Sequence, residues 1–197
     1  MYSIVKRKGE YVLNKAIFRV TYEDITKINA ETLVSSDDNY LTMGGGVSYS
    51  ILEKAGYLIQ NEVRKHIPLK VGDVAVTSAG NLPAKYIFHA VTIDYFNSIF
   101  PSEQIISDIT KKCMELADAL GVKTIAFPML GTGTGRFPFE LAVNSITKTI
   151  TNYLMEDTQI ELITLTLFPK EFFNESNMDL LVEHSIALAS IQSNQNS

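Results

Sequence analysis

The sequence contains a single cysteine, Cys113, so no disulfide bond can form within the chain and a reducing cytoplasm is the expected location. It has no surplus of positive charge, because 17 Lys and Arg stand against 22 Asp and Glu, for a net charge of −5. This balance gives no electrostatic reason to expect nucleic acid or an anionic membrane as a partner. No apolar run approaches the roughly 18 residues that span a bilayer, and the opening stretch MYSIVKRKGE lacks the apolar segment of a signal peptide. We therefore expect a cytoplasmic protein without a nucleic-acid or membrane partner.

The composition is that of an ordinary globular domain. The chain has 197 residues, of which 46% are hydrophobic and 20% are charged, which is enough to bury a sizeable core. The sequence has no internal repeat, linker or low-complexity block. We expect one domain over residues 1–197, with a frayed polar tail at 191–197.

Predicted strands and helices alternate along most of the chain. Period-two and buried apolar runs predict strands at 11–14, 16–21, 30–36, 72–80, 85–93, 123–130 and 160–168. Apolar spacing of three and four predicts helices at 47–66, 102–120, 138–155 and 170–190. This alternation predicts a three-layer α/β/α fold with a mixed, mostly parallel central sheet.

Two glycine-rich stretches each follow a predicted strand and precede a predicted helix. They are TMGGGVSYSI at 42–51 and GTGTGRFP at 131–138. Backbone N–H groups in such loops bind anions, and a following helix adds the positive end of its dipole. Because ligands of parallel sheets bind beyond the carboxyl ends of the strands, the two loops are expected to clamp a pyrophosphate. The alternative is that the glycines only mark tight turns.

Two common nucleotide-binding motifs are excluded. The chain has no G-x-x-x-x-G-K-[ST] sequence, so it lacks the phosphate loop of nucleotide hydrolysis. The stretch GTGTGRF does not fit the dinucleotide fingerprint G-x-G-x-x-G, and no N-terminal first strand carries it. A simple dinucleotide-dependent dehydrogenase is therefore not expected.

Three longer stretches resemble the macrodomain, the ADP-ribose-binding module. YEDITKINAETLVSSDDNYLTMGGGVSYSILEKAG is similar to its first half, LPAKYIFHAVT to a following strand, and IAFPMLGTGTGRFP to its second glycine loop. The matches occur in order over about residues 16–168. The resemblance implies a small-molecule nucleotide ligand, ADP-ribose or an NAD-derived relative, and no separate cofactor or metal.

The resemblance also implies roles for individual residues. Asp24 would accept from the adenine amino group with Ile25 beside it, or would only cap a turn. Phe168 would lie against the adenine or belong to the core, and Phe137 would lie near the distal ribose or only anchor its loop. The expected ligand-binding set is Asp24, Ile25, Asp37, Asp38, Gly44, Gly45, Gly46, Val47, Ser48, Gly131, Thr132, Gly133, Thr134, Gly135, Arg136, Phe137 and Phe168.

Several positions depart from the hydrolytic members of that family. Ser48 stands where such members have an aspartate, and serine is not a general base at neutral pH without a partner. A second class needs a lysine and an aspartate where this chain has Ser78 and Gly135, and a third needs paired glutamates where Glu53 stands alone. Neither His66 nor His89 supplies a base, and His89 in its apolar strand is interpreted as a buried core histidine.

The four residues SSDD at 35–38 replace the family's N-A-A-N. Adjacent strand residues point in opposite directions, so one of Asp37 and Asp38 would face the ligand and contact ribose hydroxyls or a cationic group. Alternatively, the pair only caps a polar turn. Arg136 would pair with phosphate or reach solvent, and Asp38 is the one candidate catalytic residue.

These observations favour a non-hydrolytic reader or sensor of ADP-ribose or a related nucleotide. Analogy with the family suggests a signalling nucleotide in bacterial defence, with another domain or protein of the same system as partner. One alternative is an ADP-ribosyl hydrolase or ADP-ribose-1″-phosphate phosphatase that uses Asp38. Another is an interaction module that has kept the fold and lost the ligand.

Overall fold

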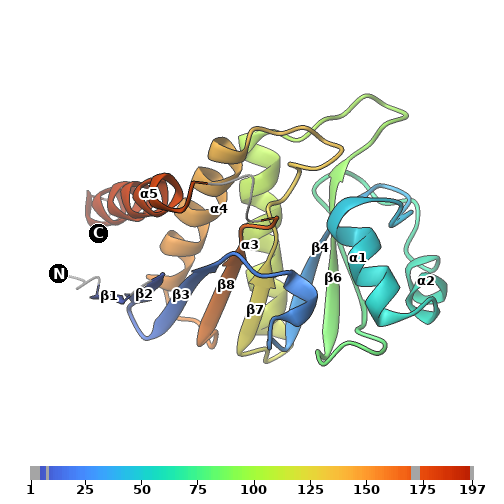
Figure 1. Ribbon diagram of the computed structural model, residues 1–197, viewed down its shortest axis with the longest axis horizontal. Helices are drawn as coiled ribbons and strands as arrows, with labels where there is room; N and C mark the ends of the chain where they lie inside the picture. Colours follow the sequence, from blue (N-terminus) through green and yellow to red (C-terminus); the bar gives the residue numbers. More distant parts are fainter. Residues whose placement is uncertain (1–4, 8, 170–173, 196–197) are drawn as a thin grey trace.

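The computed structural model describes residues 5–7, 9–169 and 174–195 (Figure 1). These residues contain an eight-stranded sheet in the order β1-β2-β3-β8-β7-β4-β6-β5. The strands are β1 (Val5–Arg7), β2 (Glu10–Leu13), β3 (Ala16–Thr21), β4 (Thr32–Asp38), β5 (Val74–Ser78), β6 (Tyr86–Ile93), β7 (Thr124–Phe127) and β8 (Leu162–Thr166). The run from β3 to β6 pairs in parallel, whereas β1, β2 and β5 pair antiparallel at the two edges. The predicted mixed, mostly parallel sheet is confirmed.

Helices cover both faces of this sheet. They are α1 (Gly46–Ala55), α2 (Leu58–Val63), α3 (Glu103–Ala119), α4 (Phe139–Leu154) and α5 (Glu175–Gln195), with the 3₁₀ turn η1 at Ile25–Lys27. The largest core cluster joins α3, α4 and α5 to one face of the sheet, and two smaller clusters lie under α1 and α2 on the other. The predicted three-layer α/β/α fold is confirmed.

The helix predicted at 47–66 is interrupted. Helix α1 ends at Ala55, and Gly56 takes the positive φ of 89° that turns the chain before α2 begins at Leu58. A Cβ atom at Gly56 would lie 2.9 Å from Asn81 Nδ2, so a close tertiary contact also favours glycine there. The single long helix was therefore a wrong prediction, although Ile51, Ala55, Ile59 and Val63 of its apolar stripe are buried as expected and Val47 is partly buried.

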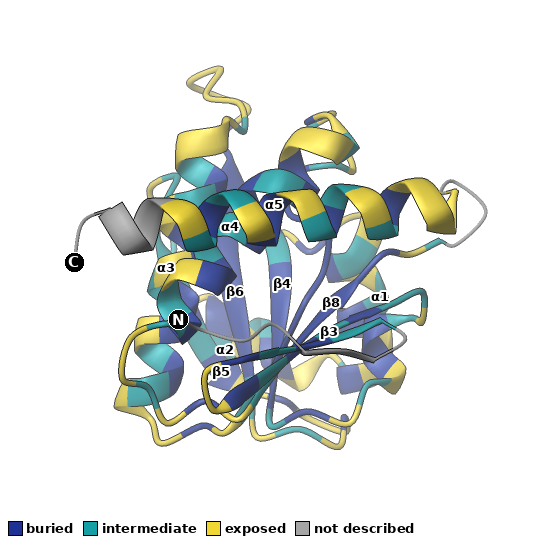
Figure 2. Ribbon diagram, turned by 90° about the vertical axis from the view of Figure 1, so that its left-hand side faces the viewer, coloured by how far each residue is buried: buried dark blue, intermediate teal, exposed yellow. Residues whose placement is uncertain are grey.

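The last helix packs against α4 with a buried stripe of Met178, Val182, Ile186 and Ala189 (Figure 2). It begins at Glu175, and the predicted start at 170 lies outside the described residues. The helix continues to Gln195. Residues 191–195, which the sequence predicts to be part of a frayed tail, are therefore helical in this structure. In the described ranges, no helix has the length and apolar character needed to cross a membrane.

Candidate functional site

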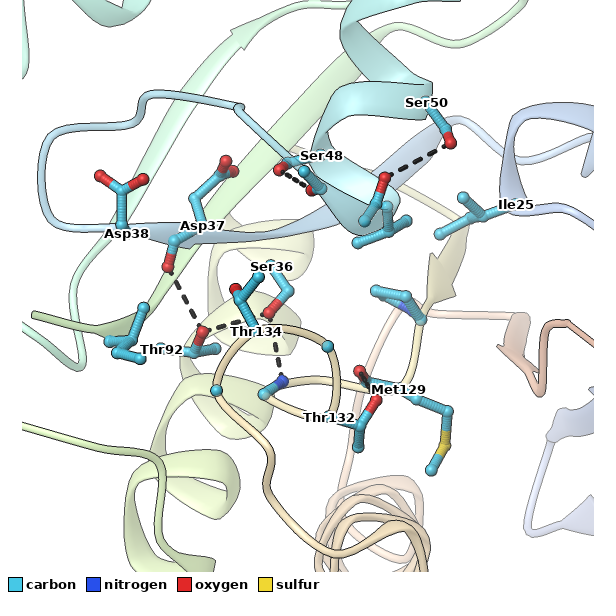
Figure 3. Close-up of a pocket in the computed structure, with 18 of the residues that line it drawn as sticks. Ile25, Ser36, Asp37, Asp38, Ser48, Ser50, Thr92, Met129, Thr132 and Thr134 are labelled. Carbon is cyan, nitrogen blue, oxygen red and sulfur yellow. Dashed lines mark hydrogen bonds between the residues drawn. The ribbon is translucent and has the colours of Figure 1, made fainter. Parts of the chain in front are cut away.

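A cleft of about 650 Å³ opens where the parallel strands β4, β6, β7 and β8 end (Figure 3). Such carboxyl ends are the usual ligand position in α/β sheets. The lining comes from η1 and its cap, from the last residues of β4, β6 and β8, from the segments that follow the four strands, and from the start of α1 and α4. Among the expected ligand-binding residues, the lining includes Asp24, Ile25, Asp37, Asp38, Gly44, Gly45, Gly46, Val47, Ser48, Gly131, Thr132, Gly133, Thr134, Gly135 and Phe168.

Two expected ligand-binding residues do not line the cleft. Phe137 is 8% exposed and belongs to the largest core cluster, and its N–H donates to the Gly131 carbonyl at 3.1 Å. Arg136 is exposed, has a positive φ of 53° and directly follows the turn at residues 134–135. In this structure Phe137 anchors its loop in the core, and the Arg136 side chain faces solvent. In both cases this is the second of the two alternatives given for the residue.

Loop 1, residues 39–45, connects β4 to the amino terminus of α1. Gly46 opens the helix with a φ of 58°, and the Ser48 hydroxyl donates to the Gly45 carbonyl at 2.8 Å. The first N–H groups of a helix have no partner within the helix, so this end of α1 presents donors and a positive dipole end to the cleft. Anions bind at such helix termini.

Loop 2, residues 128–137, follows β7 and forms the opposite wall. The Gly131 N–H donates to the Ser36 hydroxyl at 3.1 Å, which ties the loop to β4. A Cβ at Gly131 would lie 2.9 Å from Pro101, and one at Gly135 would lie 2.6 Å from the Gly131 carbonyl oxygen. Close packing therefore explains why these two positions are glycine.

Such close packing does not explain Gly45 and Gly133, which also lie in the cleft. The described part of the chain places no atom within 4 Å of a Cβ built at Gly45 or at Gly133. Neither residue has a positive φ, and Gly45 has an extended φ of −172°. Both line the cleft. The fold itself would accept a side chain at either position.

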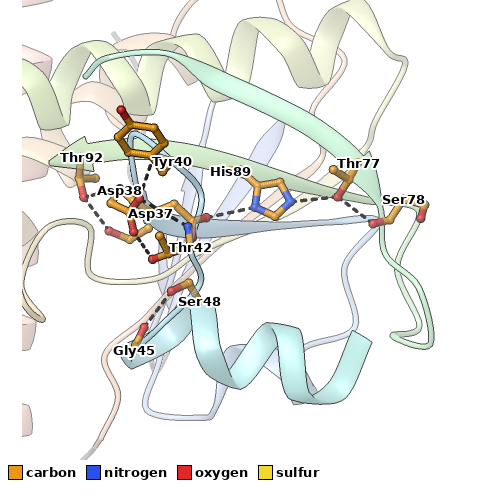
Figure 4. Close-up of polar contacts among 11 residues, drawn as sticks. Asp37, Asp38, Tyr40, Thr42, Gly45, Ser48, Thr77, Ser78, His89 and Thr92 are labelled. Atoms are coloured by element: carbon orange, nitrogen blue, oxygen red, sulfur yellow. Dashed lines mark hydrogen bonds and ion pairs between the residues drawn. The ribbon is translucent and has the colours of Figure 1, made fainter. Parts of the chain in front are cut away.

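The Asp38 carboxylate is occupied by loop 1. Its Oδ1 accepts from the N–H of Tyr40 at 2.8 Å and of Thr42 at 3.4 Å, and its Oδ2 accepts from the Thr42 hydroxyl (Figure 4). This is the turn-cap alternative. A carboxylate whose two oxygens both accept from its own loop is poorly placed to take a proton from water.

The Asp37 carboxylate is buried, and a register shift between Asp37 and Asp38 interrupts the alternation of side chains at the end of β4 (Figure 4). Its Oδ2 lies 3.1 Å from Nδ1 of His89, whose Nε2 lies 2.9 Å from the Thr77 hydroxyl. The other oxygen, Oδ1, is buried and has no hydrogen-bond partner within the described residues. His89 is 0% exposed, so the interpretation as a buried core histidine is confirmed.

Asp24 and Phe168 lie toward the β3–β8 side of the cleft. Asp24 caps η1, because its Oδ1 accepts from the N–H and the hydroxyl of Thr26, each at 2.9 Å. Asp24 thus takes the capping alternative and lines the cleft as well. Phe168 is 51% exposed, so it is not a core aromatic.

Some lining residues were missed from the sequence. The hydroxyls of Ser36 and Thr92 lie 3.1 Å apart beneath loop 2 (Figure 3). Tyr95, which also lines the cleft, follows β6. Ser36 belongs to the SSDD stretch, and its position at a strand end could have identified it, whereas Thr92 and Tyr95 belong to no motif.

Ser78, the position aligned with the lysine of another hydrolase class, does not line the cleft. Its hydroxyl donates to Glu62 at 2.6 Å and its N–H at 2.8 Å, which lowers the pKa of Glu62.

Metal ligation finds no support in residues 5–7, 9–169 and 174–195. No group of three or more His, Cys, Asp or Glu side chains there is arranged to hold a metal ion. The polar groups of the cleft are backbone N–H groups, hydroxyls and carboxylates. They suit a ligand with anionic and hydroxyl groups.

The fold and the cleft define a three-layer α/β protein with two glycine loops at the carboxyl edge of its sheet. The sequence model of the Macro domain matches residues 34–146. The chain belongs to the macrodomain family.

Relatives and solved structures agree with this assignment. An uncharacterized protein of Sulfurisphaera tokodaii is 36% identical over 80% of this chain and 87% of its own. The O-acetyl-ADP-ribose deacetylase 1 of Pantoea vagans is 32% identical over 77% of this chain and 91% of its own. The Oceanobacillus iheyensis macrodomain with ADP has the same fold, with a TM-score of 0.76 and 23% identity over 93% of this chain and 96% of that chain.

Proposed function

We propose that the protein binds ADP-ribose, or a closely related NAD-derived nucleotide, in the cleft and acts as a reader or sensor that does not hydrolyse it. The adenine lies at the side of Asp24, Ile25 and Phe168. The diphosphate lies between loop 1 and loop 2, and the distal ribose lies beyond the ends of β4 and β6. The cleft volume of about 650 Å³ is in the range of sites for ligands of this size.

The observation that carries the proposal is the pair Gly45 and Gly133. Both line the cleft, and the fold requires glycine at neither. A diphosphate held by backbone N–H groups needs close approach to bare backbone on both sides. ADP, the ligand of the Oceanobacillus iheyensis macrodomain that shares this fold, contains a diphosphate.

The absence of hydrolysis is inferred from the carboxylates. Ser48 stands at the position where hydrolytic relatives are expected to have aspartate. Asp38 is engaged by Tyr40 and Thr42, and the Asp37 side chain is 0% exposed. A general base must reach the water whose proton it takes, whereas Asp37 is buried and Asp38 is held by its own loop.

A second candidate function is hydrolysis, because the Pantoea vagans relative is named a deacetylase of O-acetyl-ADP-ribose. In that case Asp38 would leave its loop contacts when substrate binds. One assay separates the two functions: the protein is incubated with O-acetyl-ADP-ribose, ADP-ribose-1″-phosphate and mono-ADP-ribosylated protein, and the products are separated by chromatography. We expect no product above the uncatalysed rate. Turnover by wild type that is lost in Asp38→Ala would establish the enzyme instead.

A further inference from the structure

Ser36 on β4 and Thr92 on β6 form a short chain of hydroxyl groups in the cleft. Ser36 is partly exposed, whereas Thr92 is 3% exposed. Their oxygens lie 3.1 Å apart, and Thr92 also donates to the Asp37 carbonyl at 3.3 Å (Figure 3). At the other end of the chain, Ser36 accepts from the Gly131 N–H at 3.1 Å. The chain therefore joins two strands of the sheet to loop 2.

The direction of the hydrogen bonds in this chain follows from the number of hydrogens. A hydroxyl has one hydrogen to donate and two lone pairs that accept. Because Thr92 gives its hydrogen to the Asp37 carbonyl, the contact between the two hydroxyls requires Ser36 to donate to Thr92. Ser36 thus donates to Thr92 and accepts from Gly131, and its only hydrogen is held within the protein.

The bond from Ser36 to Thr92 is a weak one. O–H···O hydrogen bonds usually have oxygen–oxygen distances of about 2.7–2.8 Å, and the 3.1 Å between these two oxygens is longer. Both groups are neutral, whereas a hydrogen bond from a hydroxyl to an anionic oxygen is shorter and about twice as strong. An anionic oxygen beside Ser36 would therefore take its hydrogen from Thr92. Thr92 would keep its own hydrogen on the Asp37 carbonyl, so no buried donor would lose its partner.

Ser36 lies where the proposed function places the diphosphate. In the view of Figure 3, Ser36 lies between Ser48 at the start of α1 and Thr132 of loop 2, and all three line the cleft. Its hydrogen bond to Gly131 fixes it directly beneath loop 2. This middle position is the same whichever end of the nucleotide lies toward β3 and whichever toward β6.

We propose that Ser36 is a ligand-binding residue whose hydroxyl turns from Thr92 to an oxygen of the diphosphate when the nucleotide binds. The inference rests on the proposed function, since the diphosphate supplies the acceptor. Thr92 is a positioning residue, because it holds the Ser36 hydrogen until the nucleotide arrives. Ser36 keeps accepting from the Gly131 N–H, so one side chain both contacts the ligand and ties loop 2 to β4.

The test measures the affinity of wild type, Ser36→Ala, Ser36→Thr and Thr92→Val for ADP-ribose and for ADP by calorimetry. Ser36→Ala is expected to bind both nucleotides about tenfold more weakly, because it loses a hydrogen bond to a charged group. Ser36→Thr restores the hydroxyl and is expected to restore the affinity. Thr92→Val is expected to bind both about threefold more tightly than wild type, because no bond to Thr92 must then be broken.

The rise in affinity of Thr92→Val separates the proposal from a purely structural role. If Ser36 only tied loop 2 to β4, Thr92→Val would leave the affinity unchanged, because the bond to Gly131 remains. Thr32→Val is the matched control, since Thr32 also lies in the sheet, is 0% exposed and does not line the cleft. It is expected to bind as wild type does. Thermal denaturation shows that each variant is folded, and Thr92→Val decides alone if Ser36→Ala is not.

Three outcomes would overturn the inference while the proposed function stands. They are wild-type affinity in Ser36→Ala, no gain in Thr92→Val, and a loss in Ser36→Ala for ADP-ribose but not for ADP. The last outcome would place the hydroxyl at the distal ribose, because ADP carries the diphosphate without it. Wild type that binds neither nucleotide would refute the proposed function, and the inference with it.

Discussion

Nδ1 of His89 lies 3.1 Å from Oδ2 of Asp37, and both side chains are completely buried between β4 and β6 (Figure 4). Thr77 on β5 extends this contact across a third strand. The histidine thus fixes a carboxylate at the point where β4 enters loop 1. Buried polar pairs of this kind are costly to break, because each partner has been removed from water.

His89→Leu is expected to lower the free energy of unfolding by about 3 kcal/mol or more, because Asp37 then keeps no hydrogen-bond partner. The double variant Asp37→Leu/His89→Leu is expected to lose less than the sum of the two single variants, since it removes both polar groups together. Urea denaturation measures all three. His66→Leu is the control, because His66 is exposed and its replacement is expected to change stability by less than about 0.5 kcal/mol. Additive losses would contradict the coupling.

Gly135→Ala is expected to cost about 1–3 kcal/mol of stability and to weaken ADP-ribose binding, because its Cβ would meet the Gly131 carbonyl and Pro101. Gly133→Ala is the matched control, since its Cβ meets open space. We expect its thermal unfolding to stay near that of wild type while its ADP-ribose affinity falls. Thermal denaturation and calorimetry on both variants check this. Unchanged affinity in Gly133→Ala would remove the main support for a diphosphate at loop 2.

Asp38→Ala is expected to destabilise loop 1 by about 2 kcal/mol, because it removes the acceptors for Tyr40 and Thr42. Asp38→Asn keeps one carbonyl oxygen and is expected to lose less stability and to retain more ADP-ribose affinity. Urea denaturation and calorimetry give the two readouts. Equal losses in the two variants would show that the charge of Asp38, and not its capping geometry, matters to the cleft.

Stability is expected to fall as the pH drops below about 4.5, partly through Glu31. The hydrogen bond from the Lys85 ammonium, followed by that from the Lys123 N–H, lowers the pKa of Glu31 in the folded state. A carboxyl with a lowered folded pKa stabilises the fold above its unfolded pKa, and this contribution is lost as the pH falls through the folded pKa. Glu31→Gln should therefore be less stable at pH 7 and show a shallower decline on acidification. The measurement is urea denaturation from pH 7 to pH 3, with a substitution of the exposed Glu53, Glu53→Gln, as control. Parallel curves of stability against pH for wild type and Glu31→Gln would be inconsistent with this linkage.

The layers of the fold could be predicted from the sequence because strand and helix periodicities alternate clearly. The break at Gly56 could not, because the apolar spacing of Ile51, Ala55 and Ile59 continues across it. The contact that favours glycine there comes from Asn81, which only the folded chain brings close. The polar residues after position 36 suggested that the strand ends there. Pairing with β6 instead continues β4 through Asp38.

The glycine loops of the cleft could also be predicted, because both follow strands that end at the same edge of a parallel sheet. The burial of Asp37 could not, since its partner His89 is 52 residues away and the contact depends on the register of β4 and β6. Phe137 was expected to lie near the distal ribose, with a loop anchor as the alternative, and only its burial in the core favours the anchor. Tyr95, Phe96 and Phe100 belong to no motif, so their exposure is visible only in the folded chain.

The central claim is that the cleft binds ADP-ribose between its two glycine loops. Calorimetric titration of ADP-ribose into wild type, with Gly133→Glu beside it, tests this claim most directly. The account predicts saturable binding of one ligand per chain by wild type and its loss in Gly133→Glu, whose side chain would place a carboxylate where the diphosphate lies. Absence of binding by wild type, or equal binding by Gly133→Glu, would contradict the account.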